Sequence, residues 1–216
     1  MKKSKLRGVS TVEFALGFMV LVPLVVGTGA IGINLIRTLQ TIQLARDAGH
    51  MYARGVDFSQ TGNVNILVTL GSSVGLKASG GTAAVILTTL TYVDSNTCLA
   101  GTGSSRCNNL NKWVFVQRQT IGNSSIRTSN FGSPLTSGPT GVTMDATGTI
   151  SPSQYCSQGG AVAAFNGSGI NPYQNVNGNV SGLPSGQKVY LAEAAGQGFG
   201  MPPFVNGSPT YSFAFF

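Results

Sequence analysis

The sequence predicts an α+β protein in which one long N-terminal helix packs on a small antiparallel β-sheet. Three observations carry this prediction: an uncharged apolar run at residues 14–36, an amphipathic segment directly after it, and four later segments rich in β-branched and aromatic residues. An antiparallel sheet can bury one face against the amphipathic half of such a helix. The 216 residues of the chain suffice for one domain plus an anchor.

The apolar run is long enough to cross a membrane. From Phe14 to Ile36 there are 23 residues without a charge, and a helix rises about 1.5 Å per residue. Four Lys and Arg residues lie among the first eight positions, and such a cluster remains cytoplasmic. We therefore expect a single-pass helix, with everything after Arg37 on the far side of the membrane. A cleaved secretory signal would have a shorter apolar core that ends in small residues.

The segment 37–55 continues the helix with a different pattern. Apolar residues recur there at three- and four-residue steps and form one stripe: Leu39, Ile42, Ala45, Ala48 and Tyr52. Gly55 is the predicted C-cap, so one continuous helix is expected over residues 9–55. Pro23 removes one backbone hydrogen bond and marks a point where this helix can kink or open locally. His50, the only histidine, is expected to be solvated or interfacial rather than catalytic.

The remaining residues, 56–216, predict an exported α+β domain. Four segments favour strands and one favours a short helix: strands at 82–94, 112–122, 187–195 and 209–216, and the helix at 63–76. The change of spacing after Leu87 indicates a β-bulge. In the last strand Tyr211, Phe213 and Phe215 share one face. That face is either part of the core, which we favour, or an edge that binds a partner.

Residues 122–186 form a loop-rich insertion in this domain. The composition falls to Gly, Ser, Asn, Thr and Pro without a usable period, so long loops are expected. Residues 161–165 interrupt the insertion as a short strand or helical turn. Loops on a rigid scaffold commonly carry recognition, so the insertion is either a surface displayed to other molecules or a solvated spacer.

The cysteines favour an oxidising compartment. Cys98 and Cys107 bracket a small flexible loop between two predicted strands, where a disulfide closes easily. Cys156 is left over and can pair with either of them or with another chain. Three cysteines without C-x-x-C spacing, and one distant histidine, argue against a zinc site. We expect no metal and no cofactor.

Charge and composition also argue against nucleic-acid binding and catalysis. The net charge of +7 falls to +3 without Lys2, Lys3, Lys5 and Arg7, and no later stretch clusters Lys or Arg with aromatic residues. The six acidic residues are widely spaced, with no two within five positions of each other. With a single histidine and no phosphate-binding glycine motif, the chain is not expected to be an enzyme.

Gly8 and Glu13 give the N-terminus a more specific pattern: basic residues, a glycine, four residues, a glutamate and then the apolar helix. A carboxylate at the edge of hydrocarbon is costly unless it is paired. This pattern resembles the class III leader of type IV prepilins. The resemblance implies that residues 1–8 are a leader that prepilin peptidase removes after Gly8, so that Val9 becomes the first residue. It also implies that Glu13 faces the new α-amino group of a neighbouring subunit. Alternatively, Glu13 reaches the lipid headgroups beside Arg7.

A narrower resemblance covers residues 7–56. The stretches "GVSTVEFALGFMVLVPLVV" and "LARDAGHMYARG" resemble the TadE family of Tad (Flp) type IVc pilus proteins. Residues 12–16 and 45–48 match the family pattern directly, whereas Ser10-Thr11 and Gly49-His50-Met51 depart from it and leave the subtype open. The resemblance implies a pilin-like architecture and a minor pseudopilin.

The TadE resemblance also implies a function and partners. Such a subunit acts in pilus assembly, priming or adhesion, first in the bacterial inner membrane with its N-terminus in the cytoplasm and later at the cell surface. Its partners would be other pilins and pseudopilins through their N-terminal helices, prepilin peptidase, the Tad inner-membrane platform, and the lipid bilayer before assembly. The alternative is an uncleaved, membrane-anchored interaction protein of the pilus machinery.

Overall fold

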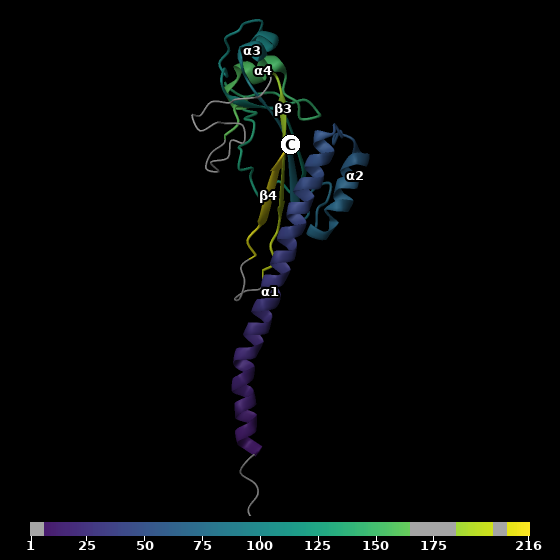
Figure 1. The fold of residues 1–216 in the computed structure, drawn as a ribbon, viewed down its shortest axis with the longest axis vertical. Helices are drawn as coiled ribbons and strands as arrows, with labels where there is room; N and C mark the ends of the chain where they lie inside the picture. Colours follow the sequence, from purple (N-terminus) through teal and green to yellow (C-terminus); the bar gives the residue numbers. More distant parts are fainter. Residues whose placement is uncertain (1–6, 165–184, 201–206) are drawn as a thin grey trace, which may run out of the picture.

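The computed structural model describes residues 7–164, 185–200 and 207–216, with side chains from residue 12 onwards. One long helix, α1 (Arg7–Ala53), projects from a head that contains the sheet and the shorter helices (Figure 1). The head also holds α2 (Thr61–Leu70), α3 (Ser95–Thr102), α4 (Pro152–Ser157) and two 3-10 turns, η1 (Ser72–Val74) and η2 (Gly159–Ala161).

Helix α1 is a single α-helix of 47 residues that runs through Pro23 without interruption. At its end, Gly55 adopts a left-handed conformation with φ of 83°. The Gly55 N–H donates to the Tyr52 carbonyl at 2.9 Å, and the Val56 N–H donates to the Met51 carbonyl at 3.1 Å. These two bonds form a Schellman motif, which requires a residue that tolerates positive φ. The predicted C-cap at Gly55 is therefore confirmed.

The sheet contains four strands, all antiparallel to their neighbours, in the order β2-β1-β3-β4. The strands are β1 (Ala83–Tyr92), β2 (Trp113–Gly122), β3 (Lys188–Gly196) and β4 (Thr210–Phe215). The α+β fold class is confirmed, and each strand lies within a residue or two of its predicted segment. The predicted bulge is also present. The register between β1 and β2 shifts between Thr89 and Leu90, which leaves Val116 of β2 without an opposite residue.

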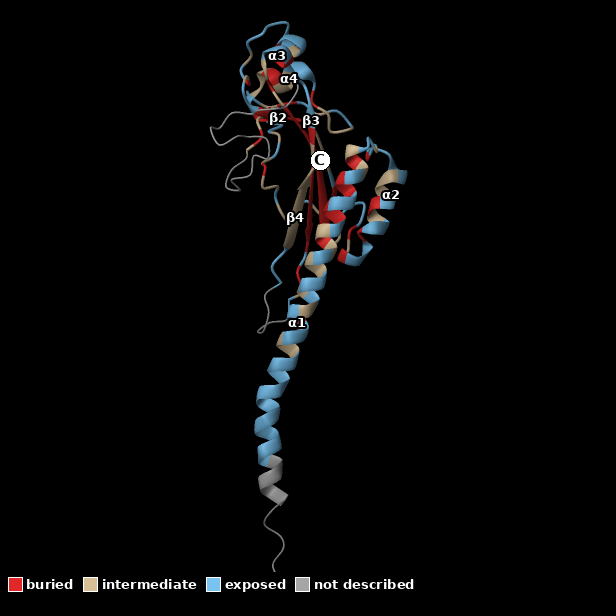
Figure 2. Cartoon of the chain, viewed as in Figure 1, coloured by how far each residue is buried: buried red, intermediate tan, exposed pale blue. Residues whose placement is uncertain are grey.

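The second half of α1 packs on one face of the sheet, across β3 and β4. The helix contributes a buried stripe that includes Ala45, Ala48 and Tyr52, and β3 contributes Ala192 and Ala194. Alanines on both sides let the helix backbone approach the strands closely. Figure 2 shows this burial beginning where α1 meets the sheet, while the projecting part of the helix remains exposed.

The other face of the sheet carries a second core with α4 and the loops between residues 123 and 164, and α3 packs against α4. Its largest buried side chains include Phe115 and Phe131. The loops are held by hydrogen bonds to β2: the Ile150 N–H donates to the Val116 carbonyl at 2.8 Å, and the Ala163 N–H donates to the Trp113 carbonyl at 2.9 Å. The described part of the predicted insertion is therefore packed structure. Residues 165–184 of that insertion lie outside the described residues.

Strand β4 is an edge of the sheet, and its side chains are half-buried on both faces. On one face, the Phe213 and Phe215 rings lie 5.3 and 5.4 Å from the Phe131 ring. On the other face, the centroid of the Phe216 ring lies 4.6 Å from that of the His50 ring of α1. The favoured prediction, that Phe213 and Phe215 belong to the core, is confirmed, because both pack against the second core. Binding of a partner at this edge remains a prediction. His50 itself is exposed, at the interface with the C-terminal residue.

Candidate membrane anchor and assembly surface

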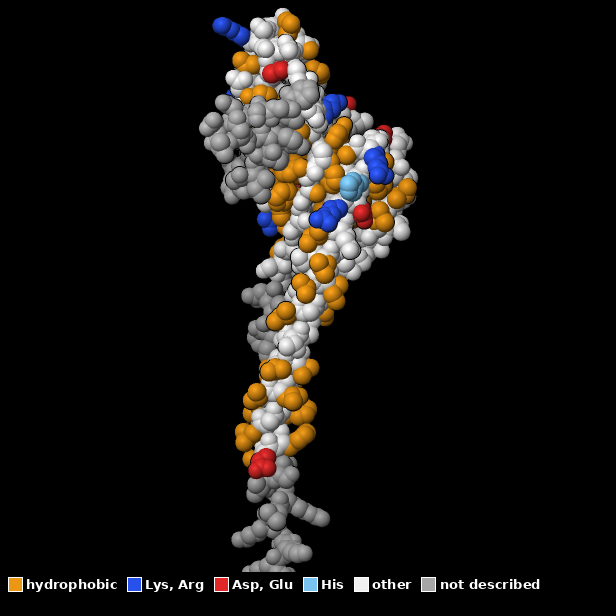
Figure 3. Space-filling view, in the orientation of Figure 1, with side chains coloured by type: hydrophobic (Ala, Val, Ile, Leu, Met, Phe, Trp, Pro, Cys, Tyr) orange, Lys and Arg blue, Asp and Glu red, His pale blue; other side chains and the backbone are white. Residues whose placement is uncertain are grey.

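The first half of α1 presents large apolar side chains on all its faces. The exposed ones are Val12, Phe14, Leu16, Phe18, Met19, Val20, Leu21, Val22, Leu24, Val25, Ile31, Ile33, Leu35, Ile36 and Leu39. Figure 3 shows hydrophobic side chains spread along the projecting part of the helix. A helix that is apolar all round needs an apolar environment. In the described part of the chain, α1 is the one helix long and apolar enough to span a membrane, and an 18-residue stretch within it has a mean hydropathy of 2.2.

Glu13 lies at the N-terminal end of this apolar surface, and its side chain is exposed. Among the side chains from residue 12 onwards that the structure describes, none forms a hydrogen bond or ion pair with the Glu13 carboxylate. Gly8 and Val9 lie in the first turn of α1, where only the backbone is described. Cleavage after Gly8 and the pairing of Glu13 with a neighbouring subunit remain predictions.

Two polar side chains interrupt the apolar run, and both find partners. The Thr28 hydroxyl donates to the Leu24 and Val25 carbonyls of its own helix, at 2.9 and 3.0 Å. The Asn34 amide is matched by the backbone of Phe199, which follows β3: Asn34 Nδ2 donates to the Phe199 carbonyl at 3.0 Å, and the Phe199 N–H donates to Asn34 Oδ1 at 2.8 Å. Asn34 was not among the predicted site residues, although a lone amide in an apolar run is itself a signal of a specific partner.

The head contains a disulfide between Cys98 and Cys107, as predicted, with Cα atoms 5.7 Å apart. The segment between them is not a flexible loop, because residues 95–102 form α3. The Asp94 carboxylate caps this helix by accepting the Thr97 N–H at 2.7 Å. Cys156 is a free, buried thiol. Burial raises the pKa of the Cys156 thiol, which disfavours the reactive thiolate.

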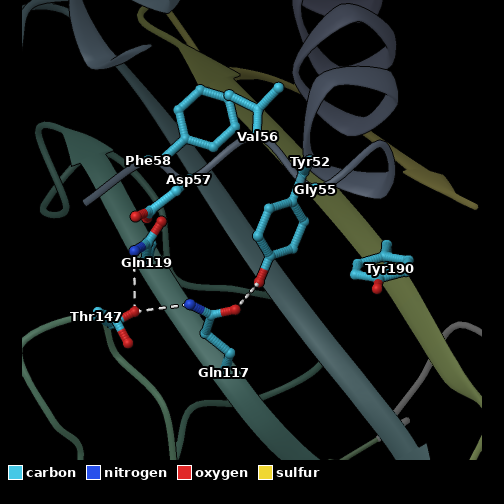
Figure 4. A pocket seen from close by; sticks show the side chains of 9 residues that line it. All are labelled: Tyr52, Gly55, Val56, Asp57, Phe58, Gln117, Gln119, Thr147 and Tyr190. Atoms are coloured by element: carbon cyan, nitrogen blue, oxygen red, sulfur yellow. Dashed lines mark hydrogen bonds between the residues drawn. The ribbon is translucent and has the colours of Figure 1, made fainter. Parts of the chain in front are cut away.

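A pocket of about 300 Å³ lies where α1 ends beside the sheet (Figure 4). The Tyr52 hydroxyl lies 2.7 Å from the Thr89 hydroxyl and donates to Gln117 Oε1 at 3.1 Å. Gln117 and Gln119 each donate from Nε2 to the Thr147 carbonyl at 2.9 Å. Burial raises the pKa of Tyr52 to about 12. The Tyr52, Thr89, Gln117 and Thr147 groups are joined by these hydrogen bonds, whereas the buried Gln119 Oε1 has no partner among the described residues. The described lining of the pocket holds no nucleophile paired with a base.

A second polar cluster is built around Glu193 of β3, which is only 1 % exposed. Its carboxylate accepts hydrogen bonds from the Ser129 hydroxyl at 2.6 Å, from the Asn130 N–H at 3.1 Å and from the Tyr211 hydroxyl. Burial and the Glu193 charge raise the pKa of Tyr211. The Arg127 guanidinium lies 4.2 Å from the Tyr211 ring centroid. This cluster fastens the loop at residues 127–131 to strands β3 and β4.

The described residues contain no group of three or more His, Cys, Asp or Glu side chains that could hold a metal ion. Comparisons with protein-family models, with curated proteins and with solved structures found no match.

Proposed function

We propose that this chain is a TadE-like minor pseudopilin of a Tad (Flp) type IVc pilus, anchored in the bacterial inner membrane and processed after Gly8. The observation that carries the proposal is the division of one unbroken helix: its first half exposes apolar side chains all round, and its second half is built into the head. The N-terminus would face the cytoplasm and the head the opposite side. The disulfide of the head suits an oxidising compartment.

The continuity of α1 gives the assembly a simple mechanism. The exposed half is stable in a bilayer, and it is also stable among apolar helices of neighbouring subunits, so a subunit can pass from lipid into a filament. Because the same helix extends into the head core, the packing of the helices fixes the position of the heads. Head-to-tail packing of this kind does not close and produces a filament. The subunit would act in assembly, priming or adhesion.

Cleavage after Gly8 would change the charge at the end of the helix in two ways. It removes Lys2, Lys3, Lys5 and Arg7, the cations that hold the N-terminus at the cytoplasmic surface. It also creates an α-amino group on Val9, which is mostly protonated at neutral pH. That cation can pair with the exposed Glu13 carboxylate of a neighbouring subunit, and pairing makes a buried carboxylate tolerable.

The substitution Gly8→Asp tests this proposal in cells that make the pilus. We expect the leader to remain on the chain and the protein to disappear from sheared surface filaments while it accumulates in the membrane. Ser4→Asp, which adds the same charge within the leader, should be processed normally. Normal piliation with an uncleaved Gly8→Asp chain would exclude the pilin role and favour the alternative, an uncleaved membrane-anchored protein of the pilus machinery.

A further inference from the structure

The head reaches down along α1 through the short segment 197–199 that follows β3. In addition to the paired bonds between Asn34 and the Phe199 backbone, Arg37 Nη1 donates to the Gln197 carbonyl at 2.8 Å. The Arg37 guanidinium carbon lies 5.9 Å from the centroid of the Phe199 ring. Residues 197–199 are called the strap below. The strap therefore fixes the head to α1 at two points: Asn34, in the last turn of the apolar run, and Arg37, the first charged residue after it.

The covered part of the helix is one-sided. Ala30 lies one turn before Asn34 on the same face and is only 2 % exposed, whereas Ile31 is 66 % exposed. Ile33 and Leu35 are exposed as well. Among the described residues, those that cover α1 at this height lie on one face, and Ile31, Ile33 and Leu35 on the other faces remain exposed.

The position of the strap along α1 matches the thickness of a bilayer. Asn34 is twenty residues after Phe14, the first residue of the uncharged run. At about 1.5 Å per residue the two are about 30 Å apart, which is the thickness of the hydrocarbon core. If Phe14 lies at the cytoplasmic boundary of the hydrocarbon, Asn34 lies at the opposite boundary. Arg37 then lies about one turn further out, at the level of the headgroups.

The chemistry of the strap suits this depth. Polar backbone groups near hydrocarbon are costly unless they are hydrogen-bonded, and the Asn34 amide satisfies both the N–H and the C=O of Phe199. The Phe199 side chain is half-buried, so part of its ring remains available to lipid. The Arg37 guanidinium, also half-buried, has donors beyond its bond to Gln197 that can reach a phosphate.

We propose that the strap, together with Asn34 and Arg37, forms a lipid contact at the extracytoplasmic surface of a phospholipid bilayer. The Phe199 ring rests at the hydrocarbon boundary, and the Arg37 guanidinium binds lipid phosphate. This inference depends on the membrane anchoring proposed above and adds to it the height and the face at which the head meets the membrane. The head would thus be held against the bilayer, with a fixed orientation, before assembly.

Tryptophan fluorescence in lipid vesicles tests this placement. The full chain with Phe199→Trp is inserted into vesicles of phosphatidylcholine and phosphatidylglycerol that carry bromine quenchers near the headgroup or deep in the acyl chains. The native Trp113, in the second core of the head, remains in every variant as a common background. We expect the added emission of Phe199→Trp to be lost to shallow bromines more than to deep ones, and the emission of the unsubstituted chain to be unaffected.

Two further variants separate the possible failures. Leu24→Trp, on an exposed position midway along the run, should be quenched most by deep bromines. If Leu24→Trp is not quenched, the membrane anchoring itself is wrong. If it is quenched and Phe199→Trp is not, only the lipid contact is wrong. Adding Asn34→Leu to Phe199→Trp should abolish the shallow quenching, whereas adding the neighbouring exposed change Ile36→Leu should preserve it. Unchanged quenching with Asn34→Leu would also overturn the proposed role of Asn34.

Discussion

The first half of α1 exposes large apolar side chains on every face, whereas the second half buries one narrow stripe with two alanines at its centre. Both halves belong to one helix with the same backbone geometry. Ala45 and Ala48 lie in one core with Ala192 and Ala194 of β3, and these small side chains allow the helix to pack close to the strands. The exposed half has no such stripe, so its large apolar side chains by themselves do not specify one protein partner. One continuous helix thus combines a specific contact with the head and an apolar surface that fits lipid or similar helices.

The largest effect should come from enlarging a side chain in the buried stripe. Ala48→Leu inserts a bulky group where the wild-type side chain is fully buried against the sheet. Such overpacking typically costs about 1–3 kcal/mol of unfolding free energy. Ala15→Leu makes the same change in the exposed half and should leave the stability of the head unchanged. Near-UV circular dichroism during denaturation in detergent micelles measures both variants, and equal destabilisation by both would refute the division of the helix.

A smaller effect is expected at the polar end of the buried half. Tyr52→Phe removes the hydroxyl that joins Thr89 and Gln117. Removing this partner from the buried Thr89 hydroxyl and from the half-buried Gln117 Oε1 should cost about 1–2 kcal/mol of unfolding free energy. Tyr92→Phe is the matched control, because the Tyr92 hydroxyl makes only a long, exposed bond to Asn111 at 3.4 Å. If both variants unfold at the same denaturant concentration, the Tyr52 hydroxyl does not stabilise the head.

The raised pKa of Tyr52 also predicts that the stability of the head depends on pH under alkaline conditions. Its pKa rises from 10.0 to about 12 in the folded head because burial disfavours the phenolate. Above pH 10 the unfolded chain releases this proton before the folded chain does, so the stability of the head falls with rising pH up to about pH 12. The loss attributable to Tyr52 should be about 1 kcal/mol at pH 11. The wild type should therefore lose more stability than Tyr52→Phe between pH 9 and pH 11, and parallel losses would contradict this assignment.

A substitution in the exposed half should have the smallest effect on the stability of the head and the largest effect on assembly. Glu13→Gln should not change the unfolding of the head, because Glu13 is exposed and lies far along the helix from the sheet. It should still insert into membranes, yet the amount recovered in sheared filaments should fall sharply, because the pairing with the Val9 α-amino group is lost. Immunoblots of membrane and sheared fractions measure this, and undiminished recovery would show that the Glu13 charge is dispensable for assembly.

The parts of the fold that follow a local period were predictable from the sequence. The apolar run, the amphipathic stripe and the four strands each repeat a pattern along the chain, and the glycine after Arg54 terminates α1 through its own conformational freedom. The bulge was expected after Leu87, and the register shifts two residues later, between Thr89 and Leu90. The helix α3 was missed because a short segment of Ser, Asn, Thr and Gly has little apolar period, and its Asp94 cap was overlooked.

The contacts that the sequence did not predict join residues far apart in the chain. Asn34 and Phe199 are 165 positions apart, and Ser129 and Glu193 are 64 apart. Each pair depends on the antiparallel order β1-β3-β4, which brings the end of the chain back to the first helix. No local pattern of residues reveals such pairs. The segment 123–164 was hard to predict for the same reason, because apart from the short α4 and η2 it consists of loops that hydrogen bonds hold to β2.

The most direct test of the assembly proposal is the mass of the N-terminal peptide in sheared surface filaments and in the membrane fraction of the same cells. If the leader is cleaved after Gly8, the chain in the sheared material should begin at Val9, with Glu13 as its fifth residue. Sheared material in which the chain still carries Lys2, Lys3 and Lys5 would contradict the proposal, because no liberated terminus would then exist to pair with Glu13.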